Sequence, residues 1–285
     1  MSCATEHLQL AVSDGVRFHV ARTGSGPAVI LLHGFTGSTE TWVELQSTLC
    51  DRYTMIAVDL TGHGKSDAPD DAQRYSLNRF ADDLRDILNS LGVSRAVILG
   101  YSMGGRAALR FGLLHPDRVA GLILESTSPG IEDPHERDRR MKSDIELADF
   151  IVREGIDAFV ERWECLPLWA SLARLQPSVL DRLHAQRLAN RPHALANSLL
   201  GAGAATDPDV IGELPYIRTI VRIIAGELDQ KYVDLGARMR TAIPQVEFDI
   251  VEGAGHMTHL ERPDRFAELV EGALDGLDRN GAAWA

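Results

Sequence analysis

The chain has 285 residues, of which 45% are hydrophobic and 25% charged, a composition typical of a globular protein with a sizeable core. Its formal net charge of −12 argues against nucleic acid or an anionic membrane surface as a partner. No apolar stretch approaches the ~20 residues that span a bilayer, and we expect no signal peptide because the first residues lack its basic and apolar regions. Cys3, Cys50 and Cys165 are widely spaced and fit no metal motif, which predicts free thiols in a reducing cytoplasm.

The first part of the chain alternates predicted strands and helices. Apolar and polar residues alternate at 8–22 around Asp14-Gly15, which predicts an antiparallel hairpin. A helix is expected to begin after Ser76 and to end at Gly92, because its apolar residues fall on one face. Continuous apolar runs predict buried strands at 28–32, 55–58, 96–99 and 119–124. This order predicts an α/β fold with a doubly wound, mostly parallel sheet.

The pattern then changes. Residues from about 131 to 213 contain no strand candidate, only helical stretches interrupted by prolines. The core resumes with strands at 220–224 and 246–251 and a helix at about 263–275. We therefore expect four segments, with the inserted cap placed where α/β proteins form binding crevices: a first part of the core at 1–128, a helical cap at 129–213, a second part of the core at 214–275 and a frayed tail at 276–285.

Gly100-Tyr101-Ser102-Met103-Gly104 joins a predicted strand to a predicted helix, which is the context of a nucleophile elbow. The glycines permit a tight turn that projects the Ser102 hydroxyl above the sheet. The Met103 N–H at the start of the helix is then expected to stabilise a negative oxygen. The loop His33-Gly34-Phe35-Thr36-Gly37 follows the strand at 28–32, so the Phe35 N–H is the expected second donor of an oxyanion hole.

Ser102, Asp229 and His256 occur in the order of an α/β-hydrolase triad, each just after a predicted strand. His256 would take the serine proton, and Asp229 would orient the imidazole and stabilise its charged form. Glu125, after another strand, is a competing carboxylate. His259 is interpreted as structural, and a zinc site with His256 lacks a third ligand, so no metal is expected. His63 is interpreted as a residue that orders its loop.

The cap carries a cluster of basic residues, most of which are expected to form a solvated helix face: Arg137, Arg139, Arg140 and Lys142, followed by Arg174, Arg182, Arg187 and Arg191.

From about residue 27 to 272 the chain resembles the 2-succinyl-6-hydroxy-2,4-cyclohexadiene-1-carboxylate synthase family of menaquinone biosynthesis, within the α/β-hydrolase superfamily. The elbow, the His33 loop and the triad motifs are shared with many hydrolase activities. The more specific matches lie in the cap and at its junctions, at Glu125 to Gly130, Glu136-Arg137, Arg140, Ser143-Asp144, Trp163, Pro167, Ala170 to Leu172, Arg187, Asn190 and Leu195-Ala196.

The resemblance implies a lyase that eliminates pyruvate from an enolpyruvyl cyclohexene with several carboxylates, without a cofactor and without an acyl-enzyme. Ser102 would act as a base supported by His256 and Asp229, with Phe35 and Met103 as oxyanion donors. Arg140 and Arg187 map to the substrate-binding arginines, and further pocket candidates are Tyr101, Arg106, Trp163 and Lys231. Always-charged, planar donors suit a polyanionic substrate.

One residue departs from the family pattern. Glu164 follows Trp163 where some relatives carry an aromatic residue, and a carboxylate facing a polyanion would be unfavourable. Glu164 is therefore expected to point away from the substrate, unless the binding mode differs.

Other functions fit the same core motifs. A serine carboxylesterase would need the same triad but an apolar pocket, and a cofactor-free oxygenase or perhydrolase is a further alternative. A ligand-binding module without activity would typically have a broken triad. The expected partner is thus a small polycarboxylate substrate, with no nucleic acid and no membrane, in the cytoplasm. The sequence does not indicate an oligomeric state.

Overall fold

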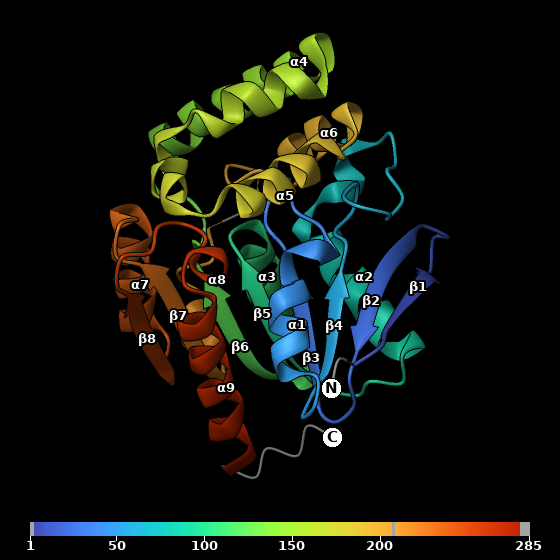
Figure 1. The fold of residues 1–285 in the computed structure, drawn as a ribbon, viewed down its shortest axis with the longest axis vertical. Helices are drawn as coiled ribbons and strands as arrows, with labels where there is room; N and C mark the ends of the chain where they lie inside the picture. Colours follow the sequence, from blue (N-terminus) through green and yellow to red (C-terminus); the bar gives the residue numbers. More distant parts are fainter. Residues whose placement is uncertain (1–2, 207–208, 280–285) are drawn as a thin grey trace.

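Eight strands form one sheet in the order β1-β2-β4-β3-β5-β6-β7-β8 in the computed structural model, which describes residues 3–206 and 209–279. β1 and β2 form the antiparallel hairpin predicted at the start of the chain, β2 runs antiparallel to β4, and the other neighbouring strands are parallel. The mostly parallel, doubly wound sheet is therefore confirmed (Figure 1). The strands are β1 (Thr5–Ala11), β2 (Arg17–Thr23), β3 (Ala28–Leu32), β4 (Thr54–Val58), β5 (Ala96–Tyr101), β6 (Val119–Glu125), β7 (Ile220–Gly226) and β8 (Val246–Val251).

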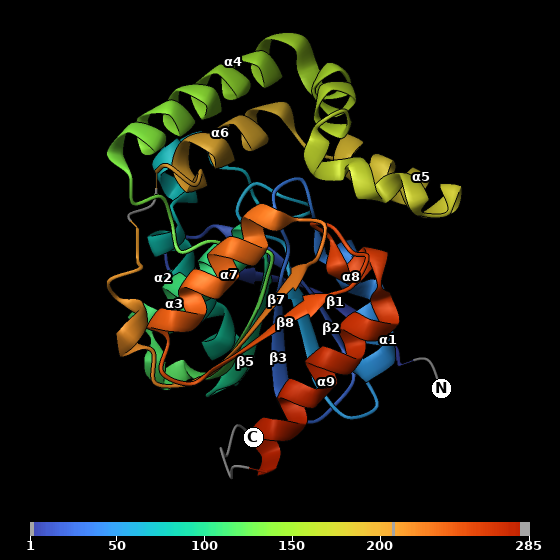
Figure 2. The same cartoon turned by 90° about the vertical axis from the view of Figure 1, so that its left-hand side faces the viewer.

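Helices cover both faces of the sheet and one of its ends. On one face lie α2 (Leu77–Ser90), α3 (Met103–Leu114) and α7 (Gln230–Ala242), and on the other lie α1 (Val43–Leu49) and α9 (Pro263–Arg279), which α8 (Thr258–Glu261) precedes (Figure 2). The cap helices α4 (Pro134–Glu164), α5 (Pro177–Leu188) and α6 (Pro192–Ala202) lie above the carboxyl ends of the strands (Figures 1 and 2). Short 3₁₀ turns are η1 (Thr39–Trp42), η2 (Ala72–Tyr75), η3 (Pro116–Arg118), η4 (Pro167–Arg174) and η5 (Leu214–Tyr216).

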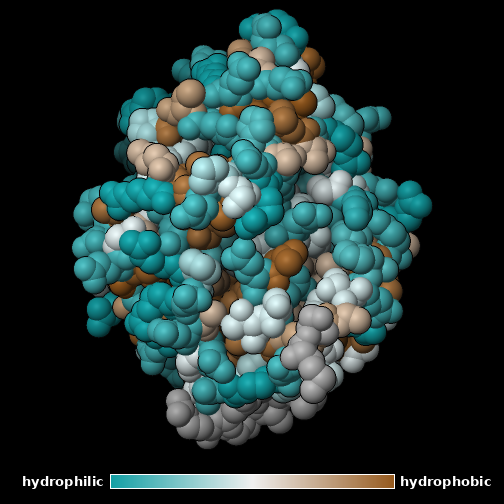
Figure 3. All heavy atoms as spheres, in the orientation of Figure 1, coloured by the Kyte–Doolittle hydropathy of each residue, from teal (hydrophilic) through white to brown (hydrophobic). Residues whose placement is uncertain are grey.

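The core has one hydrophobic cluster on each face of the sheet. Phe80 and Phe111 are buried in the cluster under α2 and α3, and Trp42 and Phe266 are buried in the one under α1 and α9. A third cluster, which includes Phe159, holds α4 against α6 within the cap. In the view of Figure 3 the surface is mostly hydrophilic, with hydrophobic residues in separate small patches. Burial of apolar area thus stabilises the core and the cap separately.

The predicted ends of helix α2 are confirmed, whereas the predicted end of helix α9 was wrong. The Ser76 hydroxyl accepts a hydrogen bond from the Arg79 N–H at the start of α2, and Gly92, with φ of 69°, follows its end. The last helix continues to Arg279, so the tail expected from residue 276 was wrong for residues 276–279. Leu277 is buried and packs over Gly121 of β6, which explains the longer helix. The rest of the expected tail, 280–285, lies outside the described residues.

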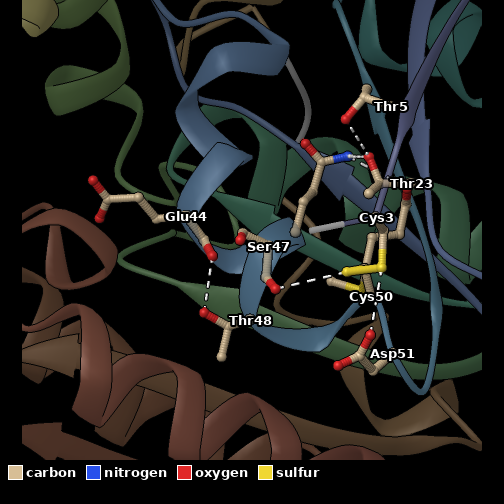
Figure 4. The surroundings of a disulfide bond; sticks show 10 residues. Cys3, Thr5, Thr23, Glu44, Ser47, Thr48, Cys50 and Asp51 are labelled. Atoms are coloured by element: carbon tan, nitrogen blue, oxygen red, sulfur yellow. Dashed lines mark hydrogen bonds between the residues drawn. A yellow bond between two sulfur atoms is a disulfide. The ribbon is translucent and has the colours of Figure 1, made fainter. Parts of the chain in front are cut away.

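Cys3 and Cys50 form a disulfide across 47 residues, so the expectation of free thiols was wrong for this pair (Figure 4). Pairing of Thr5 with Thr23 brings the start of β1 to the end of β2. A side chain at Gly24 would contact the Cys50 backbone, so this end of the hairpin also lies against the end of α1. Cys165 is exposed and free, as predicted. Within the described residues, no helix has the length and apolar character needed to cross a membrane.

Candidate active site

Ser102 occupies a sharp turn between β5 and α3. Its φ of 52° and ψ of −109° are unfavourable for a residue with a side chain, and such strain is typical of functional positions. Glycine is required nearby, because a Cβ at Gly100 would contact the backbone of Gly104, and one at Gly104 the backbone of Leu32. The Ser102 N–H donates to the carbonyl of Glu125 (2.9 Å), which fixes the turn against β6. The predicted elbow is therefore present in both sequence and geometry.

His256 and Asp229 complete a chain of hydrogen bonds that begins at Ser102. The His256 Nε2 lies 3.2 Å from the Ser102 Oγ, and its Nδ1 lies 2.6 Å from the Asp229 Oδ2. Asp229 follows β7 and precedes α7, while His256 lies between β8 and α8, so both come from the carboxyl end of the sheet. His256 is 2% exposed and Asp229 is 9% exposed. This arrangement allows His256 to exchange a proton with Ser102 while Asp229 holds the imidazole.

Glu125, the competing carboxylate, has other partners. It is fully buried at the end of β6, and its carboxylate accepts hydrogen bonds from the Thr258 hydroxyl and from the Nδ1–H and backbone N–H of His259. His259 is thus a structural partner of Glu125, whereas His256 uses both ring nitrogens with Ser102 and Asp229. The geometry favours Asp229 over Glu125 as the carboxylate that serves His256.

The loop after β3 lies directly beside Ser102. A Cβ at Gly34 would lie against the Tyr101 ring and 3.4 Å from the Ser102 Cβ, so glycine permits the close approach. His33 is buried, and it donates from Nδ1 to the Gly34 carbonyl (2.7 Å) while Nε2 accepts from the Leu60 N–H (3.0 Å). Burial lowers the pKa of His33, which favours this neutral form. The two contacts hold the loop that carries Phe35.

A cavity of about 430 Å³ opens onto Ser102 between the sheet and the cap. Asp229 lies behind His256, and Arg187 is absent from the lining. The remaining predicted site residues all line this cavity: Phe35, Tyr101, Ser102, Met103, Arg106, Arg140, Trp163, Lys231 and His256.

The basic residues of the cavity come from the core and from the cap. Arg106, on α3, donates to the carbonyls of Ala202 (2.6 Å) and Gly203 (3.2 Å), which joins the core to the end of α6. Arg140, on α4, pairs with Asp144 (2.8 Å) and remains partly exposed. Burial raises the pKa of Asp144 although Arg140 lowers it. Lys231, at the start of α7, lies over the Tyr232 ring.

Arg187 lies outside the cavity lining, where it pairs with Glu164. Its Nη1 donates to Glu164 (3.0 Å), its guanidinium lies 4.9 Å from the centre of the Trp169 ring, and it is 3% exposed. Burial lowers the pKa of Arg187 although Glu164 raises it. Glu164 also contacts His184 (3.0 Å). Glu164 therefore points away from the cavity, which is the first of the two possibilities expected from the sequence. It is instead the ion-pair partner of Arg187, the arginine that was predicted to bind substrate.

Three of the other lining residues, which were not singled out as site residues, bear on the chemistry of the cavity. The rings of Tyr232 and Trp169 lie 4.6 Å and 5.7 Å from the imidazole of His256. Arg162 lies at the exposed side of the lining with its guanidinium over Phe150. Tyr232 could have been found from its place beside Lys231, since both follow a strand end that carries Asp229. The sequence contains no pattern that distinguishes Arg162 from the other charged residues of α4.

One group of potential metal ligands is present among the described residues, and it does not include a residue of the triad. Within residues 3–206 and 209–279, the three side chains that come within reach of one ion are Cys3, Cys50 and Asp51. Both cysteines are in the disulfide, which removes their thiolates as ligands.

Comparisons with known proteins agree with this architecture. A family model described as the alpha/beta hydrolase fold matches residues 27–263. A protein of Bacillus subtilis (strain 168), provisionally named 2-succinyl-6-hydroxy-2,4-cyclohexadiene-1-carboxylate synthase, is 40% identical over 272 residues, covering 95% of this chain and 99% of that protein. The 2-succinyl-6-hydroxy-2,4-cyclohexadiene-1-carboxylate synthase of Enterobacter sp. (strain 638) is 30% identical over 237 residues, covering 83% of this chain and 87% of that one.

Solved structures with a similar fold include one of the same family and several hydrolases. The structure of MenH from S. aureus has a TM-score of 0.86 and 31% identity, covering 88% of this chain and 94% of that chain. A thermophilic esterase from Thermogutta terrifontis, solved with malate bound, has a TM-score of 0.82 and 28% identity, covering 95% of this chain and 99% of that chain.

Proposed function

Because the chain belongs to the 2-succinyl-6-hydroxy-2,4-cyclohexadiene-1-carboxylate synthase family of the α/β-hydrolase fold, we propose that it is the lyase of that name in menaquinone biosynthesis. Its substrate is 2-succinyl-5-enolpyruvyl-6-hydroxy-3-cyclohexene-1-carboxylate, and its products are pyruvate and the cyclohexadiene. One observation carries the proposal beyond the family fold. The cavity above Ser102 has basic side chains from both the core and the cap, as a substrate with several carboxylates requires.

The proposed reaction is an elimination in which no bond forms between enzyme and substrate. His256 takes the Ser102 proton, and the Ser102 oxygen removes the ring proton next to the succinyl ketone. The electron pair of that C–H bond forms a new ring double bond, the existing ring double bond shifts by one position, and the C–O bond to the enolpyruvyl group breaks, which gives the ring its two double bonds. The enolpyruvyl group leaves as the enolate of pyruvate. This enolate takes the proton held by His256 at its methylene carbon and becomes pyruvate, while the ring proton stays on Ser102 and restores its hydroxyl.

In this elimination the oxyanion donors would stabilise negative charge on a ketone oxygen, whereas in ester hydrolysis they stabilise the oxygen of a tetrahedral intermediate. The Phe35 and Met103 N–H groups would steady negative charge on the succinyl ketone oxygen as the ring proton leaves. Arg106, Arg140 and Lys231 are proposed to bind substrate carboxylates. Arg187 is proposed to contribute its positive charge without direct contact with substrate. Its guanidinium lies 4.9 Å from the centre of the Trp169 ring, and that ring, which lines the cavity, lies 5.7 Å from the His256 ring.

The decisive experiment follows pyruvate release from the enolpyruvyl substrate with a coupled lactate dehydrogenase assay. We expect one pyruvate per substrate and no acyl adduct on Ser102 by mass spectrometry. Ser102→Ala and His256→Ala should each lower kcat by about 10³-fold or more with the fold intact. Asp229→Asn should also lower kcat strongly, because it disturbs the tautomer of His256.

A serine esterase is the second candidate, and the esterase from Thermogutta terrifontis with a similar fold favours testing it. An esterase would give a burst and a trapped acyl-enzyme with p-nitrophenyl esters. We expect slow or absent turnover of these esters. Brisk ester turnover without pyruvate release, or an acyl-enzyme on the enolpyruvyl substrate, would overturn the lyase proposal.

The cytoplasm stays the proposed compartment for this reaction. The disulfide between Cys3 and Cys50 removes the cysteine argument that first suggested it. Cell fractionation tests whether the protein is in the cytoplasm. A count of free thiols in that fraction under non-reducing conditions tests whether the Cys3–Cys50 disulfide forms there.

A further inference from the structure

Glu125 contacts Ser102 and the segment that follows His256, although it touches neither reacting atom. Its backbone carbonyl accepts the Ser102 N–H (2.9 Å), which holds the elbow. Its side chain holds the loop that follows His256, through the Thr258 hydroxyl (2.6 Å), the His259 N–H (3.0 Å) and the His259 Nδ1 (2.9 Å). The same residue thus connects the two loops whose separation sets the distance from Oγ to Nε2.

The contacts of Glu125 are made in a buried part of the molecule. Glu125 and Thr258 are both fully buried, and His259 is 8% exposed. The Tyr101 ring, next to Ser102 in the chain, lies 5.3 Å from the His256 ring and 4.8 Å from the His259 ring. Hydrogen bonds to a buried carboxylate are strong, and the loss of one such acceptor leaves its donors unsatisfied. The His256 loop therefore depends on this carboxylate for its position.

A second buried carboxylate holds the other side of the same loop. Glu261 accepts hydrogen bonds from the N–H groups of Gly255 (2.9 Å) and Met257 (3.3 Å), the residues on either side of His256. Glu261 fixes the loop only to α8, a neighbouring segment of four residues. Glu125 is the contact that fixes the loop to β6 and to the elbow.

We propose that Glu125 is a positioning residue that sets the geometry between Ser102 and His256 through its carboxylate. The inference rests on the proposed roles of these two residues. Glu125 lies outside the cavity lining, so its removal should lower kcat and leave KM unchanged. Small misplacements of reacting groups are costly, and a shift of about 1 Å lowers rates by about 10²-fold.

The first measurement is the rate at which diisopropyl fluorophosphate labels Ser102. This rate requires an activated serine but no elimination of pyruvate, so it separates this inference from the proposed reaction. Glu125→Ala should lower both the labelling rate and kcat by about 100-fold. Glu125→Gln should recover part of both, because the amide oxygen still accepts from Thr258 and the His259 N–H.

The second measurement is the far-downfield proton NMR signal expected from the Nδ1–H of His256, which is bound to Asp229 at 2.6 Å. It should broaden or shift in Glu125→Ala. The matched control is Asp83→Asn, which alters another fully buried carboxylate, on α2, whose partners are Arg74 and Arg79. This control should lose stability but keep the labelling rate and the His256 signal of the folded protein.

The inference is overturned if Glu125→Ala, once folded, labels at the wild-type rate with an unchanged His256 signal. If Glu125→Ala does not fold, Thr258→Val decides the matter, since it removes one hydroxyl donor and little volume. About tenfold slower labelling with an unchanged circular dichroism spectrum supports the inference. An unchanged labelling rate and NMR signal in Thr258→Val overturns it.

Discussion

Arg140 and Arg187 carry the same charge on neighbouring cap helices but lie in different surroundings. Arg140 lines the cavity and forms an ion pair with Asp144, a carboxyl whose pKa is raised by burial. Arg187 is buried beside Trp169 with Glu164 as its counterion. A substrate carboxylate in the cavity can reach the Arg140 guanidinium directly, whereas Arg187 lies outside the cavity lining.

Arg140→Ala should therefore raise KM for the enolpyruvyl substrate by about tenfold or more, as expected for loss of one charge-assisted hydrogen bond. The control is Arg139→Ala, because Arg139 is exposed on the same helix and outside the cavity lining. Its KM should stay at the wild-type value. Equal and small effects of both substitutions, measured by initial rates of pyruvate release, would place Arg140 with the solvated face of α4.

Sequence motifs predict the triad well because each member follows a strand, and parallel strands bring their carboxyl ends to one edge of the sheet. Ser102, Asp229 and His256 needed no more than this rule and their chain order. The partner of Arg187 could not be predicted, because Glu164 lies 23 residues earlier and meets it only when α4 packs against α5. Side-chain pairing between helices depends on crossing angles that single-sequence patterns do not contain.

Within the cap, α4 is the element that the sequence described least. The prolines predicted helical segments, yet residues 134–164 run as one long helical stretch that turns at Gly155. Gly155 has φ of 84° and ψ of −179°, a conformation essentially limited to glycine. The turn is accommodated by the backbone, so no hydrophobic or proline pattern marks it. It redirects the end of α4 toward α5 (Figure 2). This end carries Trp163, which lines the cavity, and Glu164.

Gly155→Ala should destabilise the protein by about 1–3 kcal/mol through backbone strain. A Cβ at this position would have no neighbour within 4 Å, so steric overlap cannot explain a loss. Gly212→Ala is the matched control, because it also has open space around the Cβ but no positive φ. The denaturant midpoint of Gly155→Ala should be lower than that of Gly212→Ala. A stability of Gly155→Ala equal to wild type would show that α4 can straighten at this point.

At the scale of the whole molecule, the net charge and the cavity have opposite signs. The chain carries −12 overall, yet among the described residues the cavity lining holds four basic side chains and two acidic ones. Composition alone could therefore exclude nucleic acid as a partner but could not reveal an anion site. The sign of a local field depends on which few charges the fold brings together. The same limit applies to the Cys3–Cys50 pair, which only the sheet brings into contact.

Stability of the whole molecule should also fall in acid because of one buried histidine outside the triad. His63 is fully buried after β4, donates from Nδ1 to the Thr61 carbonyl (3.0 Å), and its Nε2 has no hydrogen-bond partner within the described residues. The pKa of His63 is lowered from 6.5 to about 3, mainly by burial; the nearby His33 and Arg191 also act to lower it, whereas Thr61 and Asp59 act to raise it.

The unfolded chain therefore binds a proton at His63 below about pH 6.5, whereas the folded protein does not until about pH 3. Protonation then favours unfolding, so the His63 contribution to stability is complete above pH 6.5 and is lost as the pH falls. Between pH 7.5 and 4.5 the free energy of unfolding should drop by about 2–3 kcal/mol because of His63.

His63→Gln should remove this part of the pH dependence. The control variant His193→Gln, at an exposed position of α6, should keep it. Urea titrations at the two pH values measure the difference directly. If His63→Gln loses as much stability in acid as the wild type, His63 takes up its proton in the folded protein as readily as in the unfolded chain, and the prediction is wrong.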